Sequence, residues 1–212
     1  MHVLKLKKDT RVAKRSVSMG DKGRKTKELI IKKSYQIFSE KGFSAVTMQD
    51  ICKICELSRG GLYRYYSSTQ QIFEEILIRL TESDEDIIKE GIRQKCLARD
   101  ILNAALEKMQ KEMLDSNTSL SYAIYEYSVY CKTDFIMEIN QKAKDKWVSL
   151  INYGIQQKEF PKINPEQIAD LLLYVYQGVR IFSRIIPIKE RTINNIILQI
   201  KQDLGVNENG CN

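Results

Sequence analysis

Apolar residues recur at helical spacing along most of the 212-residue chain, and no stretch alternates apolar and polar residues as a β-strand does. The three prolines all follow residue 160, so no proline interrupts a helical pattern before that point. We therefore expect an all-α protein. The apolar runs predict helices near residues 24–41, 68–92, 98–114, 119–131, 134–158, 165–185 and 190–204.

Three helix-start signals lie close together over residues 47–73, TMQDICKICELSRGGLYRYYSSTQQIF. The candidate N-caps are Thr47, which pairs with Asp50 as a capping box, Ser58, and Ser68, which pairs with Gln71. A short helix, a turn and a compact second helix over 59–65 are predicted before a long helix begins at residue 68. This order indicates a helix-turn-helix, whose second helix would enter the major groove of DNA.

Positive charge is concentrated in the first third of the chain. Residues 1–67 hold 16 Lys+Arg and 6 Asp+Glu, whereas residues 68–212 hold 18 and 21, so the two parts carry +10 and −3 and sum to the net +7. A basic head that faces phosphates fits this asymmetry. Residues 1–23 resemble a flexible basic arm that would reach toward a DNA groove; the alternatives are a solvated tail or an extension before a second start at Met19.

The two last predicted helices suggest a dimer interface. Asn164 and Pro165 mark the start of a helix over 165–185 that is apolar around most of its circumference, so it needs cover on two sides. The helix over 190–204 has a single apolar stripe. Together they predict a four-helix interface with two helices from each subunit; the alternative is a monomer whose largest core lies here. Residues 206–212 are expected to be a flexible tail.

The head resembles the TetR family of bacterial transcriptional repressors. The resemblance covers about residues 24–77 and rests on IFSEKGFSAVTMQDICKICELSRGGLYRYYSS, with Phe-Gly closing the first helix, a threonine opening the second, then S-x-G-x-L-Y and a further aromatic. It implies an all-helical homodimer with a three-helix DNA-binding domain, here 24–67, and a larger regulatory and dimerisation domain, here 68–205. Such a regulatory domain usually binds a small effector that releases DNA.

The resemblance also implies which residues contact DNA. The candidates are Thr47, Ser58, Arg59, Gly60, Gly61, Tyr63, Arg64, Tyr65, Ser68 and Thr69. Arg59 could donate two hydrogen bonds to guanine, and Tyr63 could donate to a phosphate. The chain departs from the family pattern at Gly61 instead of threonine and at Thr69 instead of lysine. It also departs at Glu56, where a turn glycine is usual, so that either a non-glycine adopts a positive φ or the turn differs locally.

Little in the sequence indicates catalysis. Cys52 and Cys55 form a C-x-x-C without a second pair or a histidine cluster, and the sole histidine is His2, so we interpret both cysteines as core residues and expect no metal, no cofactor and no enzyme. Five scattered cysteines suggest a reducing cytoplasm. No apolar run approaches the roughly 18 residues that span a bilayer.

Aromatic residues over 119–135 and in the next helix predict a ligand cavity. The candidate ligand contacts are Tyr122, Tyr125, Glu126, Trp147 and Tyr174, which would suit a flat apolar or cationic compound. A helix over 68–92, about 37 Å long, would connect this cavity to the head. Its tilt would change the separation of the dimer's recognition helices, which must be about 34 to 36 Å.

The sequence thus predicts a dimeric repressor of a palindromic operator, released by a small apolar or aromatic effector. Two alternatives remain open. A partner protein could control the head in place of a small molecule, or the chain could coat DNA as an architectural protein with little sequence preference. A closed cavity would favour control by a small effector over control by a partner protein. Equal affinity for random and operator DNA would favour the architectural protein.

Overall fold

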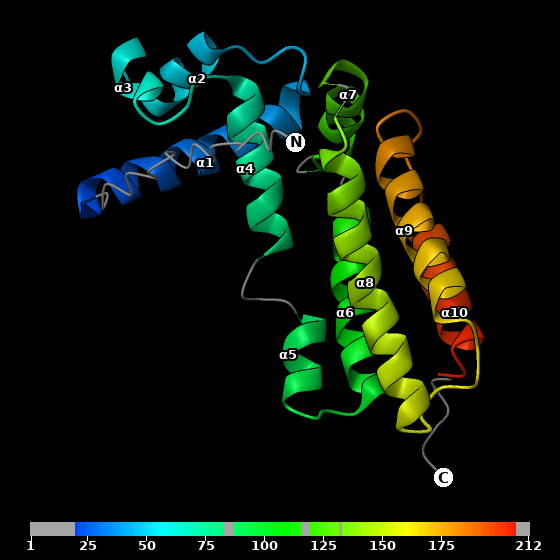
Figure 1. Ribbon diagram of the computed structural model, residues 1–212. Helices are drawn as coiled ribbons and strands as arrows, with labels where there is room; N and C mark the ends of the chain where they lie inside the picture. Colours follow the sequence, from blue (N-terminus) through cyan, green and yellow to red (C-terminus); the bar gives the residue numbers. More distant parts are fainter. Residues whose placement is uncertain (1–19, 83–86, 116–118, 132, 207–212) are drawn as a thin grey trace, which may run out of the picture.

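The computed structural model describes residues 20–82, 87–115, 119–131 and 133–206, and within these ranges the chain folds into helices only (Figure 1). The expected all-α class is confirmed. The helices are α1 (Asp21–Lys41), α2 (Met48–Cys55), α3 (Arg59–Tyr63), α4 (Thr69–Thr81), α5 (Ile87–Arg93), α6 (Ala98–Leu114), α7 (Ser121–Cys131), α8 (Phe135–Gln156), α9 (Pro165–Phe182) and α10 (Glu190–Asp203). None of these described helices is long and apolar enough to cross a membrane.

Helices α1 to α4 form the head, with α1 packed against α2 and α4 (Figure 1). The buried side chains of Phe38 and Phe73 meet edge to face, with ring centroids 4.9 Å apart, at the centre of this core. Tyr127 of α7 joins the same cluster and lies 5.1 Å from the ring of Phe43. The head core therefore continues into α7, although the sequence pattern placed a domain boundary at residue 67.

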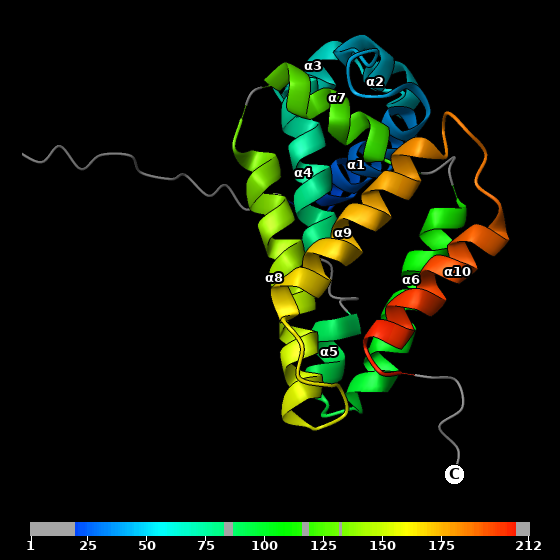
Figure 2. The ribbon, with the colours of Figure 1, turned by 90° about the vertical axis from the view of Figure 1, so that its right-hand side faces the viewer.

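The other helices, α5 to α10, form the body. Leu102 and Leu106 of α6, Leu150 and Ile151 of α8, and Leu172 of α9 are fully buried in its core. Helix α9 packs against α8, and α10 packs against α6. Helices α9 and α10 lie on the same side of the body, the side that faces the viewer in Figure 2. The apolar stripe predicted on the last helix is thereby used inside the subunit: its members Ile193, Ile197, Ile200 and Leu204 are buried against the body core.

The helix predicted over residues 68–92 is wrong as a single element. Helix α4 ends at Thr81 with Glu82 as its C-cap, and α5 begins after the gap in the described residues, at Ile87. The sequence TESDED over residues 81–86 supplies no apolar side chain that could continue the buried stripe of α4. The 13 residues of α4 span only about 20 Å, so any lever between head and body is shorter than predicted.

Smaller differences concern the helix ends. Helix α1 begins at Asp21, three residues before the predicted start, and α3 ends at Tyr63 instead of residue 65. Gly42 terminates α1 with φ 83, a positive value that glycine adopts without steric cost. Most of the predicted arm over 1–23 and of the tail over 206–212 lies outside the described residues.

Candidate nucleic-acid interface and cavity

Two local backbone features fix the position of α3. Ser58 is its N-cap, because Ser58 Oγ accepts a hydrogen bond from the Gly61 N–H at 3.1 Å. Glu56 ends α2 with φ 56 and ψ 36, the left-handed conformation that glycine adopts most easily. Of the two possibilities left open by the sequence at this non-glycine position, the positive φ is the one observed. The turn of the helix-turn-helix therefore keeps its usual geometry at some cost in backbone strain.

Helix α3 presents one face to solvent and one to the head core. Leu62 is fully buried and anchors the inner face, and Tyr65, in the turn after the helix, packs partly against the same core. The exposed positions are Arg59, Gly60, Tyr63 and Arg64. A Cβ built on Gly60 would meet no atom within 4 Å, so this side of the helix is open to a close partner. The arrangement fits insertion of α3 into a DNA groove.

The starts of α2 and α4 are both capped by side chains. Thr47 and Asp50 form the predicted capping box, with the Thr47 N–H donating to Asp50 Oδ2 at 3.0 Å. The hydrogen bonds from Thr47 also hold the pKa of Asp50 below its usual value, so this carboxylate stays negative. A phosphate at the start of α2 would be repelled by it, which weakens Thr47 as a candidate contact. At α4, Ser68 Oγ accepts the Gln71 N–H at 3.2 Å.

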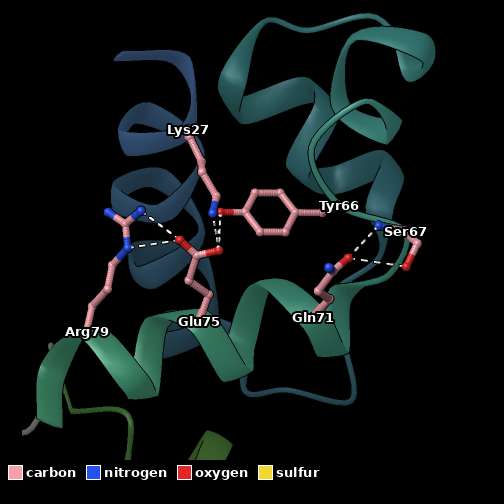
Figure 3. A network of polar contacts seen from close by, with 6 residues as sticks. All are labelled: Lys27, Tyr66, Ser67, Gln71, Glu75 and Arg79. Carbon is pink, nitrogen blue, oxygen red and sulfur yellow. Dashed lines mark hydrogen bonds and ion pairs between the residues drawn. The ribbon is translucent and has the colours of Figure 1, made fainter. Parts of the chain in front are cut away.

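The second half of the capping box predicted at Ser68 is shifted by one residue. Gln71 Oε1 accepts the N–H of Ser67, at 2.8 Å, instead of the N–H of Ser68 (Figure 3). Ser68 and Thr69 are both half-buried at this helix start. Any phosphate contact here would therefore depend on N–H groups of the first turn of α4 and on the hydroxyls of these two residues.

Glu75 of α4 is the centre of a polar network that ties the head together (Figure 3). Its carboxylate receives the ammonium of Lys27 from α1 at 2.7 Å, the guanidinium of Arg79 at 2.7 Å and the hydroxyl of Tyr66 at 3.0 Å. Partial burial opposes ionisation of Glu75, but these three donors outweigh it and lower its pKa. The network fixes α4 relative to α1 and to the turn that follows α3.

Replacing Glu75 with glutamine is expected to lower the free energy of unfolding by about 2 kcal/mol at pH 7, because the hydrogen bonds of a charged acceptor are lost beside the buried Tyr66. Since the folded pKa lies below the unfolded value of about 4.3, the difference from wild type should be complete above that pH and vanish as the pH falls through the folded pKa. Urea unfolding at several pH values measures it.

The matched control for this prediction is Glu28→Gln, which removes one exposed carboxylate from α1. Its unfolding free energy should stay within about 0.5 kcal/mol of wild type. A Glu75→Gln protein that is as stable as this control at pH 7 would contradict the role given to the network.

Helices α7 and α8 and the segment just after α9 contact the head. Glu126 accepts the hydroxyl of Ser44 at 2.6 Å and its N–H at 3.1 Å, in the loop between α1 and α2. Arg184, just beyond α9, donates to the carbonyl of Ser39 at 2.8 Å. Tyr127 donates to Glu74 of α4 at 2.5 Å. The end of α1, the loop after it and α4 are thus attached to the body by separate polar contacts.

The body contains a cavity of about 280 Å³ between the end of α4 and helices α5, α6, α8 and α9. Its wall is mainly apolar, with a few polar groups. The lining residues are Leu80, Ile87, Ile88, Ala105, Lys108, Met109, Glu112, Ala143, Lys146, Trp147, Leu172, Leu173, Tyr176 and Gln177. Apolar walls with few polar groups are typical of small-molecule sites.

The structure does not bring the five predicted ligand residues together. Trp147 lines the cavity, but the other four lie elsewhere: Glu126 binds Ser44, and Tyr122 lies under the guanidinium of Arg184 at 5.3 Å. Tyr125 and Tyr174 point to solvent, being 56% and 72% exposed.

The sequence reasoning missed Tyr176 and Lys146 as cavity residues. Tyr176 follows the buried Leu172 by one helical turn, and this spacing could have placed it on the inner face of α9. Lys146 gives no comparable signal, because a lysine beside Trp147 on an amphipathic helix is ordinarily solvated.

Cys52 and Cys55 are buried in the head core, as the sequence predicted. Burial raises the pKa of the Cys55 thiol to about 11, so the reactive thiolate is strongly disfavoured. Both residues therefore act as small apolar side chains of the helix-turn-helix.

Two family models match the chain, one in each part. The model described as bacterial regulatory proteins, tetR family, matches residues 30–76, and the model described as tetracyclin repressor-like, C-terminal domain, matches residues 101–194. The first match contains α2 and α3 with their caps, and the second contains most of the cavity wall.

Relatives and solved structures agree with these matches. The HTH-type transcriptional regulator YfiR of Bacillus subtilis is 28% identical over 157 residues, which cover 71% of this chain and 76% of that protein. The HTH-type transcriptional repressor KstR2 of Rhodococcus jostii is 25% identical over 146 residues, with coverage of 66% and 70%. The reduced form of Escherichia coli NemR shares the fold, with a TM-score of 0.71 at 14% identity over 86% of this chain and 100% of that one. The chain therefore belongs to the TetR family of DNA-binding transcriptional regulators, which are not enzymes.

Proposed function

We propose that the protein is a dimeric repressor whose α3 helices bind a palindromic operator in the cytoplasm, and that a small apolar or aromatic molecule in the body cavity releases it. The observation that carries this proposal is the exposed face of α3, which includes Arg59, Gly60, Tyr63 and Arg64. Ser58 caps this helix, and the buried Leu62 packs its inner face against the head core. Arginine at this place suits bidentate readout of guanine, and tyrosine suits a phosphate oxygen.

An exposed apolar face on α9 supports a dimer. The large apolar side chains left in solvent on α9 and just beyond it are Leu171, Tyr174, Phe182, Ile185 and Ile186, with exposures from 41% to 72%. Leu171, Tyr174 and Phe182 are three and eight residues apart, which is about one and two helical turns, so they share one face of α9. A Cβ on Gly178, on the same face, would meet open space. Contiguous apolar surface of this kind marks a protein interface. From α10 we expect only its outward surface, including Leu198, to take part.

The position of α4 supports release by an effector. Five residues separate the end of α3 from the start of α4, and Leu80 near the end of α4 lines the cavity. A ligand that displaces the end of α4 would change the separation of the two recognition helices in the dimer. A coupling of about 1 to 3 kcal/mol would lower operator affinity about 5- to 150-fold.

Selection of bound duplexes from a random pool tests the proposal, and we expect enrichment of a two-fold symmetric sequence with half-sites about one helical turn apart. Operator affinity is then measured by fluorescence anisotropy against a panel of apolar and aromatic compounds. Compounds that weaken operator binding should themselves bind more weakly when operator is present, because the coupling is reciprocal.

The alternatives give different results. If the selection enriches no sequence, and the protein binds random and selected DNA with equal affinity, then it is an architectural DNA-binding protein. A symmetric operator whose affinity no compound changes would contradict release by a small molecule and favour control by a partner protein.

A further inference from the structure

The carbonyl end of α1 is held by Arg184, which follows α9. Its guanidinium donates hydrogen bonds to the carbonyl oxygens of Ser39, at 2.8 Å, and of Glu40, at 3.4 Å. The last carbonyls of a helix lack intrahelical partners and carry partial negative charge, so a cation at this place stabilises the helix end. The same guanidinium lies 5.3 Å from the ring centroid of Tyr122 in α7, which packs beside α9 (Figure 2). Arg184 thus joins α1 of the head to two helices of the body.

The other side of the same turn is held by Glu126 of α7. Its carboxylate accepts the hydroxyl of Ser44 at 2.6 Å and the N–H of Ser44 at 3.1 Å. Gly42 lies between the two attachments, and a Cβ built on it would come within 2.3 Å of the Glu126 carboxylate and 2.9 Å of the Tyr122 ring. The turn is therefore closely fitted into a socket of the body, which consists of Tyr122, Glu126 and Arg184.

The socket adjoins the surface proposed for the dimer. Phe182, Ile185 and Ile186 flank Arg184 in sequence, and their side chains are 52%, 71% and 53% exposed. The backbone of this segment is a hydrogen-bonded turn, in which the N–H of Arg184 donates to the carbonyl of Ile181 at 3.3 Å and the N–H of Ile186 donates to that of Phe182 at 3.0 Å. One short segment therefore carries both the exposed apolar side chains and the cation that holds α1.

We propose that Arg184 is a positioning residue that fixes the head relative to the dimer interface, and that it thereby restricts the operator to one spacing between half-sites. This inference rests on the proposed function, in which α9 and the residues just beyond it form the dimer interface. The two α3 helices of a dimer must lie about 34 to 36 Å apart to enter successive major grooves. A head that pivots at the socket reaches several separations, each in a smaller fraction of the dimers.

Other contacts keep the head attached to the body when Arg184 is replaced. The ring of Tyr127 in α7 is buried against the head core, with its centroid 5.1 Å from that of Phe43 and 5.3 Å from that of Phe73. Its hydroxyl also donates to Glu74 of α4. Arg184 is itself exposed, so its replacement should leave the core intact. Loss of Arg184 should therefore free the end of α1 without unfolding or detaching the head.

Selection of duplexes from a random pool, run in parallel with wild type and Arg184→Gln, tests the proposal. Wild type should enrich one spacing between two half-sites, whereas the variant should enrich the same half-site at several spacings. Affinity of the variant for the wild-type operator should fall about tenfold, because fewer dimers have the correct separation. Affinity for a duplex with a single half-site should stay within about twofold of wild type, since only one head binds it. Sedimentation velocity should show that both proteins are dimers.

Two further variants separate position from charge. Arg191→Gln removes the same charge from an exposed side chain in the first turn of α10, outside the socket, and should select the wild-type spacing. Arg184→Lys keeps a cationic donor for the carbonyls of α1 and should also retain a single spacing. If Arg191→Gln weakens operator binding as much as Arg184→Gln does, then the loss comes from net charge, and the role of Arg184 is overturned.

Failure of this inference can be separated from failure of the proposed function. An Arg184→Gln protein that enriches only the wild-type spacing, with unchanged affinity, would overturn the inference and leave a dimeric repressor in place. Equal weakening on the single half-site and on the full operator would also overturn it, because Arg184 would then act on each head alone. If wild type itself enriches no symmetric sequence, the proposed function fails and the inference fails with it.

Discussion

Glutamate at both Tyr174 and Ile185 is expected to convert the dimer into a monomer and to lower operator affinity more than about 100-fold, because the avidity of two linked half-site contacts is lost. These side chains are 72% and 71% exposed in the subunit, so the substitutions should not disturb its own core. In a dimer they would bury unpaired charges, which is costly. Sedimentation velocity measures the assembly, and fluorescence anisotropy measures operator binding.

The control places two glutamates at Leu97 and Leu114, which are 51% and 44% exposed at the two ends of α6. This variant should remain dimeric and bind operator normally. If the α9 variant also stays dimeric, the interface lies elsewhere. The next candidate is then the outward side of α7, where Tyr125, Val129 and Tyr130 are more than half exposed.

The helix-turn-helix could be predicted from sequence because its determinants are local. A capping box such as that of Thr47 and Asp50 joins residues three apart, and its geometry depends little on the rest of the chain. The same holds for Ser58 and for the positive φ of Glu56. The start of α9 at Asn164 and Pro165 was equally readable, and its asparagine side chain accepts the N–H of the second and third helical residues.

The cavity could not be predicted in the same way because its position depends on how distant helices pack. In α7, tyrosines occur on several sides of the helix, and only the tertiary contacts decide that Tyr127 is buried while Tyr125 is in solvent. Tyr174 and Tyr176 lie two residues apart and so point to opposite sides of α9. Glu126 meets Ser44, which lies 82 residues away in the chain. No local pattern encodes such a pairing.

The break between α4 and α5 illustrates the opposite error. The apolar positions of α4 and of α5 can be joined into one helical stripe, because the spacing of Leu80 and Ile87 is two full helical turns. The charged residues between them were compatible with a solvated helix and gave no stop signal such as glycine or proline. The physical consequence is a short α4 whose end needs a partner, and Lys146 supplies it.

Replacing Arg59 with alanine is expected to lower operator affinity about 10- to 100-fold, because each bidentate contact to guanine is worth about 1 to 3 kcal/mol of discrimination. Arg59 is exposed at the first position of α3, so its removal should leave folding unchanged. Affinity for a scrambled duplex should fall much less. Fluorescence anisotropy on both duplexes at several salt concentrations measures the two effects separately.

Arg59→Lys is the matched control for charge. Lysine retains one positive charge but lacks the planar fork of donors, so this variant should keep most of the salt dependence while losing the preference for operator over scrambled DNA. If Arg59→Ala instead weakens binding equally on both duplexes, and Arg59→Lys restores it, then Arg59 contacts a phosphate. Base readout would in that case have to come from Tyr63 or Arg64, the other long exposed side chains at the outer surface of α3.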